Sequence, residues 1–373
     1  MTDPASELPA PDLFDRVLTD DELEDITAAD ETSTAVTFST QAFDVAGLVL
    51  RLDRGSMLVP TYGTDDDRVD TDGFQRGFVW TKAQMDRFIE SLLLGFPVPG
   101  IFLVKQTANN RLLVLDGQQR LLTLQKFYSG IHAKKEFALR NVGEQFKGLT
   151  YKTLGDAMQF RLDDSYLHAT IVTTDGSAEM NEAIYQIFER LNSGGTQLTA
   201  HEIRVALSAG PIIELLEQLN SNTAWRTLYG GRSARLRDQE LTLRILALFE
   251  KSDEYSRPLK TFLNNYANDA RQLGGSILAA SQFFTEAATA LLPLGPEVLR
   301  TQGATQINVA RTEAIFVGVM RAIALDALVV DLSAAIETLD ADAEFVTATT
   351  RSTADKEFVL SRIEKATRAF TRE

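Results

Sequence analysis

The chain has 373 residues, enough for one large domain or two ordinary ones. Its composition, with 44% hydrophobic and 24% charged residues, is typical of a globular protein. It has no cysteine and only three histidines, which excludes disulfides, thiol catalysis and cysteine-ligated metals and argues against a site of several histidines. No apolar run is expected to reach the ~20 residues that cross a bilayer, and the acidic start is unlike a signal peptide. We therefore expect a cytoplasmic protein with no membrane partner.

Charge is uneven along the chain. The net charge of −15 argues against nonspecific binding to nucleic acid. Residues 1–34 are strongly acidic and are typical of a lead-in segment outside the fold. Residues 120–152 reverse the balance, with seven Lys or Arg against two Glu, which indicates either a solvated basic face or an anion-binding surface.

The first half of the chain mixes strand and helix patterns, while nearly every later segment predicts a helix. Thr81 and Gln84 fit a capping box, and Gly95 ends the helix that follows. We therefore predict an α+β protein with a mixed α/β first half and an all-helical second half. The predicted elements are a helical stripe over 43–52, strands at 56–62, 101–105 and 111–116 (the last two a hairpin), a helix at 118–128, a strand at 166–174, and helices at 178–192, 200–208, 211–220, 238–250, 258–272, 275–292, 305–338 with a break, and 353–370.

The stretch "VLDGQQRLL" places five polar or flexible residues between two apolar segments. A strand that ends in Asp116 and Gly117 and is followed at once by a helix exposes backbone N–H groups, which favour an anion. Arg120 would give a forked contact to a phosphate, and Asp116 would hold a metal ion or orient a water. Gln118 and Gln119 offer neutral donors and acceptors. The alternative is an ordinary N-cap and turn with exposed helix formers.

Two other polar stretches would converge on the same ligand. Gln75 and Arg76 lie among aromatic residues in "GFQRGFVW"; alternatively, Arg76 only caps a carbonyl or stacks on Trp80. "LNSGGT" resembles a phosphate-binding loop in composition but lacks the Walker A lysine, and a C-cap followed by a Thr199–Glu202 capping box also explains it. Charged residues that flank this loop, among them Glu202 and Arg204, are equally consistent with surface ion pairs.

The histidines receive no catalytic role. His168 lies in a strand pattern, His201 at a helix start and His132 in a predicted loop.

Together the segments "FQRGFVW", "VLDGQQRLLTLQKFY", "IFERLNSGGTQLTAHEIR" and "DQELTLRILALF" resemble, in this order, the DGQQR domain, the N-terminal half of GmrSD-type modification-dependent restriction enzymes. The resemblance covers roughly residues 43–270. It implies a ParB/sulfiredoxin-like fold for residues 35–200, with a helical domain at 201–373. It also implies that the domain binds and hydrolyses nucleoside triphosphates (NTP) with Mg²⁺ and thereby controls a nuclease that acts on modified foreign DNA.

Carried over to this sequence, the resemblance assigns two sets of residues. The catalytic set is Asp116, Gln118, Gln119 and Arg120, with Asp116 also as the metal ligand. The nucleotide-binding set is Gln75, Arg76, Gly117, Asn192, Ser193, Gly194, Gly195 and Thr196.

One departure from the family pattern concerns the nuclease. The restriction enzymes carry a second, histidine-dependent HNH domain, and here no histidine follows His201, so we expect no such activity from this chain. The helical half would instead bury an open face of the core, form a homodimer or dock a partner. We predict an NTP-hydrolysing sensor or regulatory subunit of an anti-phage or restriction system, with a separately encoded nuclease as effector.

Two alternatives stay open. The first is a non-enzymatic module that binds DNA or a partner through the same anion site, favoured by the basic stretch and by Arg232, Arg235 and Arg237. The second is a nuclease on the ParB-like core itself, with Asp116 and Glu202 as metal ligands.

Overall fold

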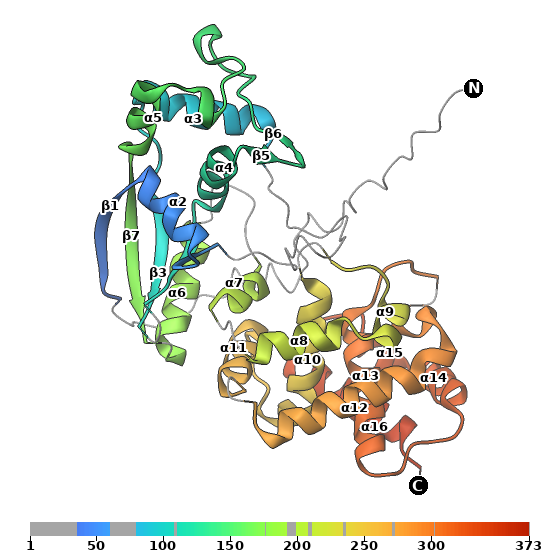
Figure 1. The fold of residues 1–373 in the computed structure, drawn as a ribbon. Coiled ribbons are helices and arrows are strands. Elements are labelled where there is room, and N and C mark those ends of the chain that lie inside the picture. Colours follow the sequence, from blue (N-terminus) through green and yellow to red (C-terminus); the bar gives the residue numbers. More distant parts are fainter. Residues whose placement is uncertain are drawn as a thin grey trace, which may run out of the picture. The chain divides into compact units, whose positions relative to one another are not determined.

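The computed structural model describes residues 36–59, 80–107, 110–175, 177–191, 199–207, 211–233, 236–270, 273–301 and 303–372. These residues form two compact units, shown in Figure 1. We call residues 36–191 the mixed unit and residues 199–372 the helical unit, and each is described by itself.

The mixed unit is built on a five-stranded sheet with the order β1-β7-β3-β4-β2. β3 and β4 pair antiparallel, which confirms the predicted hairpin, while β3 runs parallel to β7 and β2 runs parallel to β4. β1 pairs antiparallel with β7 at one edge. A separate two-stranded sheet, β5 with β6, follows the helix that comes after this hairpin. It contains His132, which was predicted to lie in a loop. The strands are β1 (Phe38–Asp44), β2 (Met57–Leu58), β3 (Ile101–Gln106), β4 (Leu112–Asp116), β5 (Ile131–His132), β6 (Lys135–Glu136) and β7 (Tyr166–Thr174).

Helices of the mixed unit pack their apolar side chains into one core with the sheet. α2 (Val45–Asp53), α3 (Lys82–Leu94), α4 (Gln118–Ser129) and α5 (Asp156–Asp163) share one core with the strands. α6 (Ala178–Leu191) packs on β7, and Figure 1 shows it alongside the sheet. Two 3-10 turns, η2 (Glu144–Phe146) and η3 (Tyr151–Thr153), complete the unit.

Capping side chains and glycines set where the helices of the mixed unit begin and end. Thr81 and Gln84 form the predicted capping box of α3, and Gly95 ends that helix with a φ of 74°. The predicted helix over 43–52 starts too early: strand β1 continues to Asp44, whose carboxylate accepts from the N–H of Gly47 and caps α2. Pairing of β1 with β7 therefore overrides the helical stripe at its first residues.

The helical unit confirms each helix predicted beyond residue 199, with the predicted break falling between α13 and α14, and adds α9 and α15. α13 lies at its centre, buried along most of its length and packed against α10, α12 and α16. Gly318 permits the close contact with α16, since a Cβ there would lie 2.7 Å from the carbonyl carbon of Ala366. The helices are α7 (Ala200–Leu207), α8 (Pro211–Asn220), α9 (Thr223–Tyr229), α10 (Arg237–Lys251), α11 (Leu259–Asp269), α12 (Gly275–Leu291), α13 (Val309–Ala324), α14 (Leu332–Ala341), α15 (Ala343–Ala348) and α16 (Lys356–Phe370), with 3-10 turns η5 (Ser252–Glu254), η6 (Leu292–Leu294) and η7 (Pro296–Leu299).

One apolar stretch is longer than expected. Gly275–Leu294 is long and apolar enough to cross a membrane, and it is the one such stretch in the described part of the chain. One side of α12, including Ile277 and Phe284, is buried in the core of the helical unit. The exposed side carries Gln282 and Glu286, joined by a 2.8 Å hydrogen bond. This amphipathic pattern is that of a core helix.

Candidate functional site

The backbone turn from β4 into α4 has a geometry that lets a ligand come close to the main chain. Gly117 is buried and has a φ of 95°, a left-handed conformation that favours glycine. A Cβ at this position would lie 3.0 Å from Cβ of Ile101 and would overlap its Cγ2, so a side chain is excluded. Gly117 occupies the N-cap position of α4 and no described side chain caps this helix, so the alternative of Asp116 as an ordinary N-cap is wrong. The backbone N–H groups of the first turn are therefore not covered by a cap.

Arg120 is engaged within the protein. Its Nη1 donates to the carbonyls of Pro99 and Gly100, the latter at 2.7 Å, and its Nη2 donates to Oδ2 of Asp116 at 2.7 Å. The Arg120 side chain is 11% exposed, whereas that of Asp116 is 53% exposed. Arg120 therefore ties the start of β3 to the end of β4 and orients the one carboxylate of the motif that faces solvent.

The two glutamines differ in their partners. Gln119 Oε1 accepts from the backbone N–H of Trp80 at 3.2 Å, and the Trp80 ring packs edge-on against Phe88. Within the described ranges, Gln118 has one hydrogen bond, a long one of 3.5 Å from its Nε2 to the Val114 carbonyl. Gln119 thus anchors the start of α4 to the residue that follows "GFQRGFV".

The structure brings together only part of the predicted site. Asp116 to Arg120 form one cluster at the start of α4, with Trp80 beside it. Gln75, Arg76 and the loop residues Asn192, Ser193, Gly194, Gly195 and Thr196 lie outside the described residues. Their convergence on the same ligand stays a prediction.

The far end of α4 is fixed by a tyrosine pair that the sequence did not reveal. The Tyr128 and Tyr151 hydroxyls donate to Oδ1 of Asp163 at 2.6 and 3.0 Å, and the two rings stack with centroids 4.1 Å apart. Burial, together with the bond to Asp163, raises the pKa of Tyr151 to about 12 and raises the pKa of Tyr128 as well. Both hydroxyls therefore remain donors, and α4 is held at both ends.

Within the helical unit, α7 carries the charged residues that follow "LNSGGT". Thr199 and Glu202 form the predicted capping box, with backbone-to-side-chain contacts of 2.6 and 3.2 Å. Glu202 and Arg204 are fully buried, so the alternative of surface ion pairs is wrong for these two residues. One Glu202 oxygen is used by the cap, which gives no support to a metal-ligand role.

His201 is also buried, and it lies between two polar partners. Its Nε2 is 3.1 Å from Oε1 of Gln239, and its Nδ1 is 3.0 Å from Nη1 of Arg204. Burial, reinforced by the charge of Arg204, lowers the pKa of His201 to about 3. The imidazole is therefore neutral at ordinary pH.

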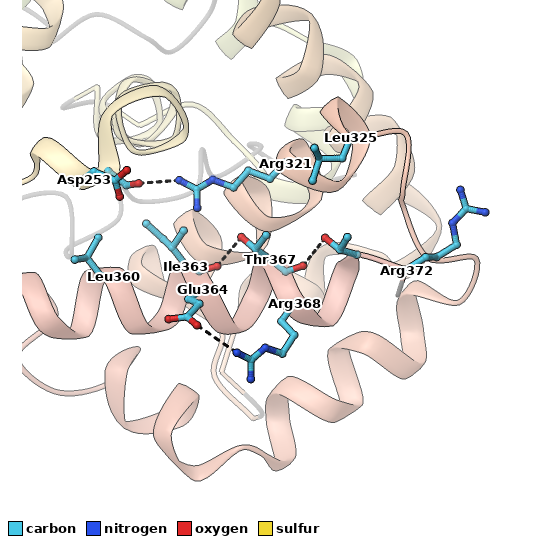
Figure 2. A pocket seen from close by; sticks show the side chains of 11 residues that line it. Asp253, Arg321, Leu325, Leu360, Ile363, Glu364, Thr367, Arg368 and Arg372 are labelled. Carbon is cyan, nitrogen blue, oxygen red and sulfur yellow. Dashed lines mark hydrogen bonds and ion pairs between the residues drawn. The ribbon is translucent and has the colours of Figure 1, made fainter.

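A pocket of about 620 Å³ lies elsewhere in the helical unit, beside α16 (Figure 2). Two of its arginines have partners within the pocket: Arg321 donates to the Ser252 hydroxyl at 2.7 Å, and Arg368 donates to Glu364 at 3.3 Å. Residues from η5, α13 and α16 form the pocket, which is why no single stretch of sequence predicts it. Its charged side chains are of both signs, so they select no ligand class.

The fold and this site define an α+β protein in which a mixed sheet presents a strand, a glycine turn and an uncapped helix start, with a helical unit after it. Residues 63–208 match the family described as the GmrSD restriction endonuclease, N-terminal domain. This part of the chain is therefore a GmrSD-type N-terminal domain, which indicates a role related to restriction. No curated protein matches the chain. No solved structure matches it either.

Proposed function

We propose that this chain is a nucleotide-binding, NTP-hydrolysing sensor or regulatory subunit of a restriction system, and that it acts on a separately encoded nuclease. The turn at Gly117 supports this proposal most directly. A buried glycine with no room for a side chain precedes an uncapped helix start, an arrangement that suits the close approach of a phosphate. We further propose a ParB/sulfiredoxin-like core for the mixed unit, since that fold binds phosphates at such a helix start.

The contacts suggest a division of roles within the motif. Asp116 is the exposed carboxylate, and Arg120 positions it rather than contacting the phosphate first. Gln119 anchors α4 through Trp80. Gln118, whose amide oxygen has no hydrogen bond among the described residues, is the amide best placed to orient a water.

Mg²⁺ fits this donor set only in part. No group of three His, Cys, Asp or Glu residues gathers for a metal within the described ranges, so Asp116 would be the one carboxylate ligand there. Mg²⁺ commonly uses one or two carboxylates plus substrate phosphates and water, which is consistent with such a site. When bound, the ion would neutralise phosphate charge.

A hydrolysis assay on the full chain with ATP, GTP, CTP and UTP tests the proposal. Wild type is expected to release phosphate in a Mg²⁺-dependent manner, and Asp116→Asn is expected to lose most of this activity while keeping its melting temperature. A nucleotide that binds should also raise the melting temperature of wild type. Neither turnover nor a thermal shift with any of the four nucleotides would refute the proposal. DNA binding that depends steeply on salt but not on nucleotide would favour the binding-module alternative.

A further inference from the structure

The two faces of the sheet in the mixed unit differ in how they are covered. One face belongs to the core shared with α2, α3, α4 and α5 and includes Leu103 and Ile171. The opposite face, which we call the outer face, is covered at one end by α6, where the Thr174 hydroxyl donates to Oδ1 of Asn181 at 3.4 Å. Val104 is buried at this end. At the other end of the outer face, side chains of β1, β3, β4 and β7 are partly or fully exposed.

A row of four residues crosses this open end of the outer face. Phe102 of β3 lies opposite Asp116 of β4 on one side and opposite Thr170 of β7 on the other. Thr170 in turn lies opposite Thr40 of β1. Opposite residues in a ladder share a face, and neighbouring strands lie about 4.8 Å apart, so Asp116 and Thr170 are separated by about 10 Å across Phe102. The carboxylate of the proposed phosphate site is therefore part of this row.

His168 adds a second polar side chain to the same face. It precedes Thr170 by two residues on β7, about 7 Å along the strand, and it is exposed. Its neighbour on the β3 side is Gly100, where a Cβ would lie 2.7 Å from the His168 carbonyl oxygen. The Gly100 carbonyl accepts from Arg120, which also holds Asp116. Within the described ranges, neither the His168 imidazole nor the Thr170 hydroxyl is used in a hydrogen bond.

The chemistry of these side chains suits a nucleoside. Phe102 is partly exposed and offers an aromatic ring on which a base of any kind can stack. A hydroxyl and an imidazole each donate and accept hydrogen bonds, as the ribose hydroxyls and the edge of a base require. We infer that the nucleoside of the bound nucleotide lies on the outer face, with its base on Phe102 and its polar groups hydrogen-bonded to Thr170 and His168. This inference rests on the proposed function, which places the phosphates at Gly117.

The test compares two ligands of the full chain by titration calorimetry. The first is the Mg-bound nucleotide, among ATP, GTP, CTP and UTP, that wild type binds most tightly, and the second is Mg-bound inorganic triphosphate, which has no nucleoside. Thr170→Val removes one hydroxyl from the outer face and should raise the nucleotide Kd about fivefold, the usual effect of one hydrogen bond. The matched control, Thr173→Val, makes the same change in the same strand on the opposite face and should leave this Kd unchanged.

Two further variants test the other contacts. Phe102→Leu keeps an apolar side chain but loses the ring, so it should raise the nucleotide Kd about tenfold. His168→Ala should raise it by a factor similar to that of Thr170→Val. Because His168 is exposed, this variant folds and carries the test if Phe102→Leu lowers the melting temperature strongly. None of the variants should change the Kd of inorganic triphosphate, because they leave the turn at Gly117 intact.

The outcomes separate this inference from the proposed function. If wild type binds a nucleotide but the outer-face variants shift its Kd no more than Thr173→Val does, the inference is wrong and the proposed function stands. The same conclusion follows if the variants weaken inorganic triphosphate as much as the nucleotide, or if wild type binds both ligands equally well. If wild type binds no nucleotide, the proposed function fails and the inference falls with it.

Discussion

The buried charges between α10, α13 and α16 allow a quantitative prediction. Glu313 is fully buried and contacts both Arg244 and Arg362, the second at 2.6 Å, and the two arginine side chains are 9% and 1% exposed. Replacing Glu313 with Gln keeps the shape but removes the carboxylate that contacts both buried guanidinium groups. Breaking a buried ion pair from one side costs about 3–5 kcal/mol. That is a large part of the stability of an ordinary domain, about 5–15 kcal/mol.

Urea unfolding at 25 °C, followed by tryptophan fluorescence, measures this loss. The chain has two tryptophans, so Trp80→Phe leaves Trp225, which is buried in the core of the helical unit, as the reporter of that unit. Glu364→Gln is the matched control, since its contact with Arg368 is exposed and should be worth under about 1 kcal/mol. Replacing Arg244 and Arg362 with Met and Glu313 with Leu together should restore most of the stability.

Two results would refute this reasoning. Glu313→Gln within 1 kcal/mol of the control would mean that the pairing energy only balances the cost of desolvation. An apolar triple variant less stable than Glu313→Gln would mean that the other contacts of Arg362, to the Ala348 and Thr353 carbonyls, matter more than the charge pair.

The remaining predictions concern single side chains. Gly117→Ala should lower the stability of the mixed unit by more than the ~1–2 kcal/mol of a left-handed residue, because its Cβ also overlaps Ile101; an unchanged melting temperature would contradict this. Asp86→Ala should cost about 3–5 kcal/mol in urea unfolding, since this buried carboxylate accepts from Lys82 and from the backbone and side chain of Asn141; a loss under 1 kcal/mol would count against it. Below pH 6.5 the unfolded chain protonates His201 while the folded chain does not, so stability should fall as pH falls from 6.5 toward 3, by up to about 1.4 kcal/mol per pH unit. His201→Gln should remove this part of the slope, and parallel stability–pH curves for the two proteins would contradict the assignment.

Elements with strong periodicity were predictable from the sequence. β7 and α8 have the predicted limits, residues 166–174 and 211–220, because each has a clear apolar pattern and distinct end signals. β1 was not predictable, since nearly all of its residues are exposed and only its pairing with β7 defines it. α5 was missed because it buries a single apolar residue, Leu162.

The position of the candidate site could be predicted from the sequence, but the hydrogen-bond partners of its residues could not. Gly117 before a helix start can be recognised from strand and helix patterns alone. The backbone partners of Arg120 cannot, because they are carbonyls 20 and 21 residues away that every residue type offers. The same holds for His201, whose partner Gln239 lies 38 residues further along and is polar like many exposed residues.

The close contact at Gly318 has a consequence for how α13 and α16 tolerate change. A methyl group there would push the two helices apart, and the same two helices carry the Glu313–Arg362 bond. Both features depend on one interhelical distance, so their effects on stability should not be additive. Gly318→Ala should cost much less in a background that already lacks the ion pair. The two positions therefore form one epistatic unit, in which the first substitution to arise decides whether the second is tolerated.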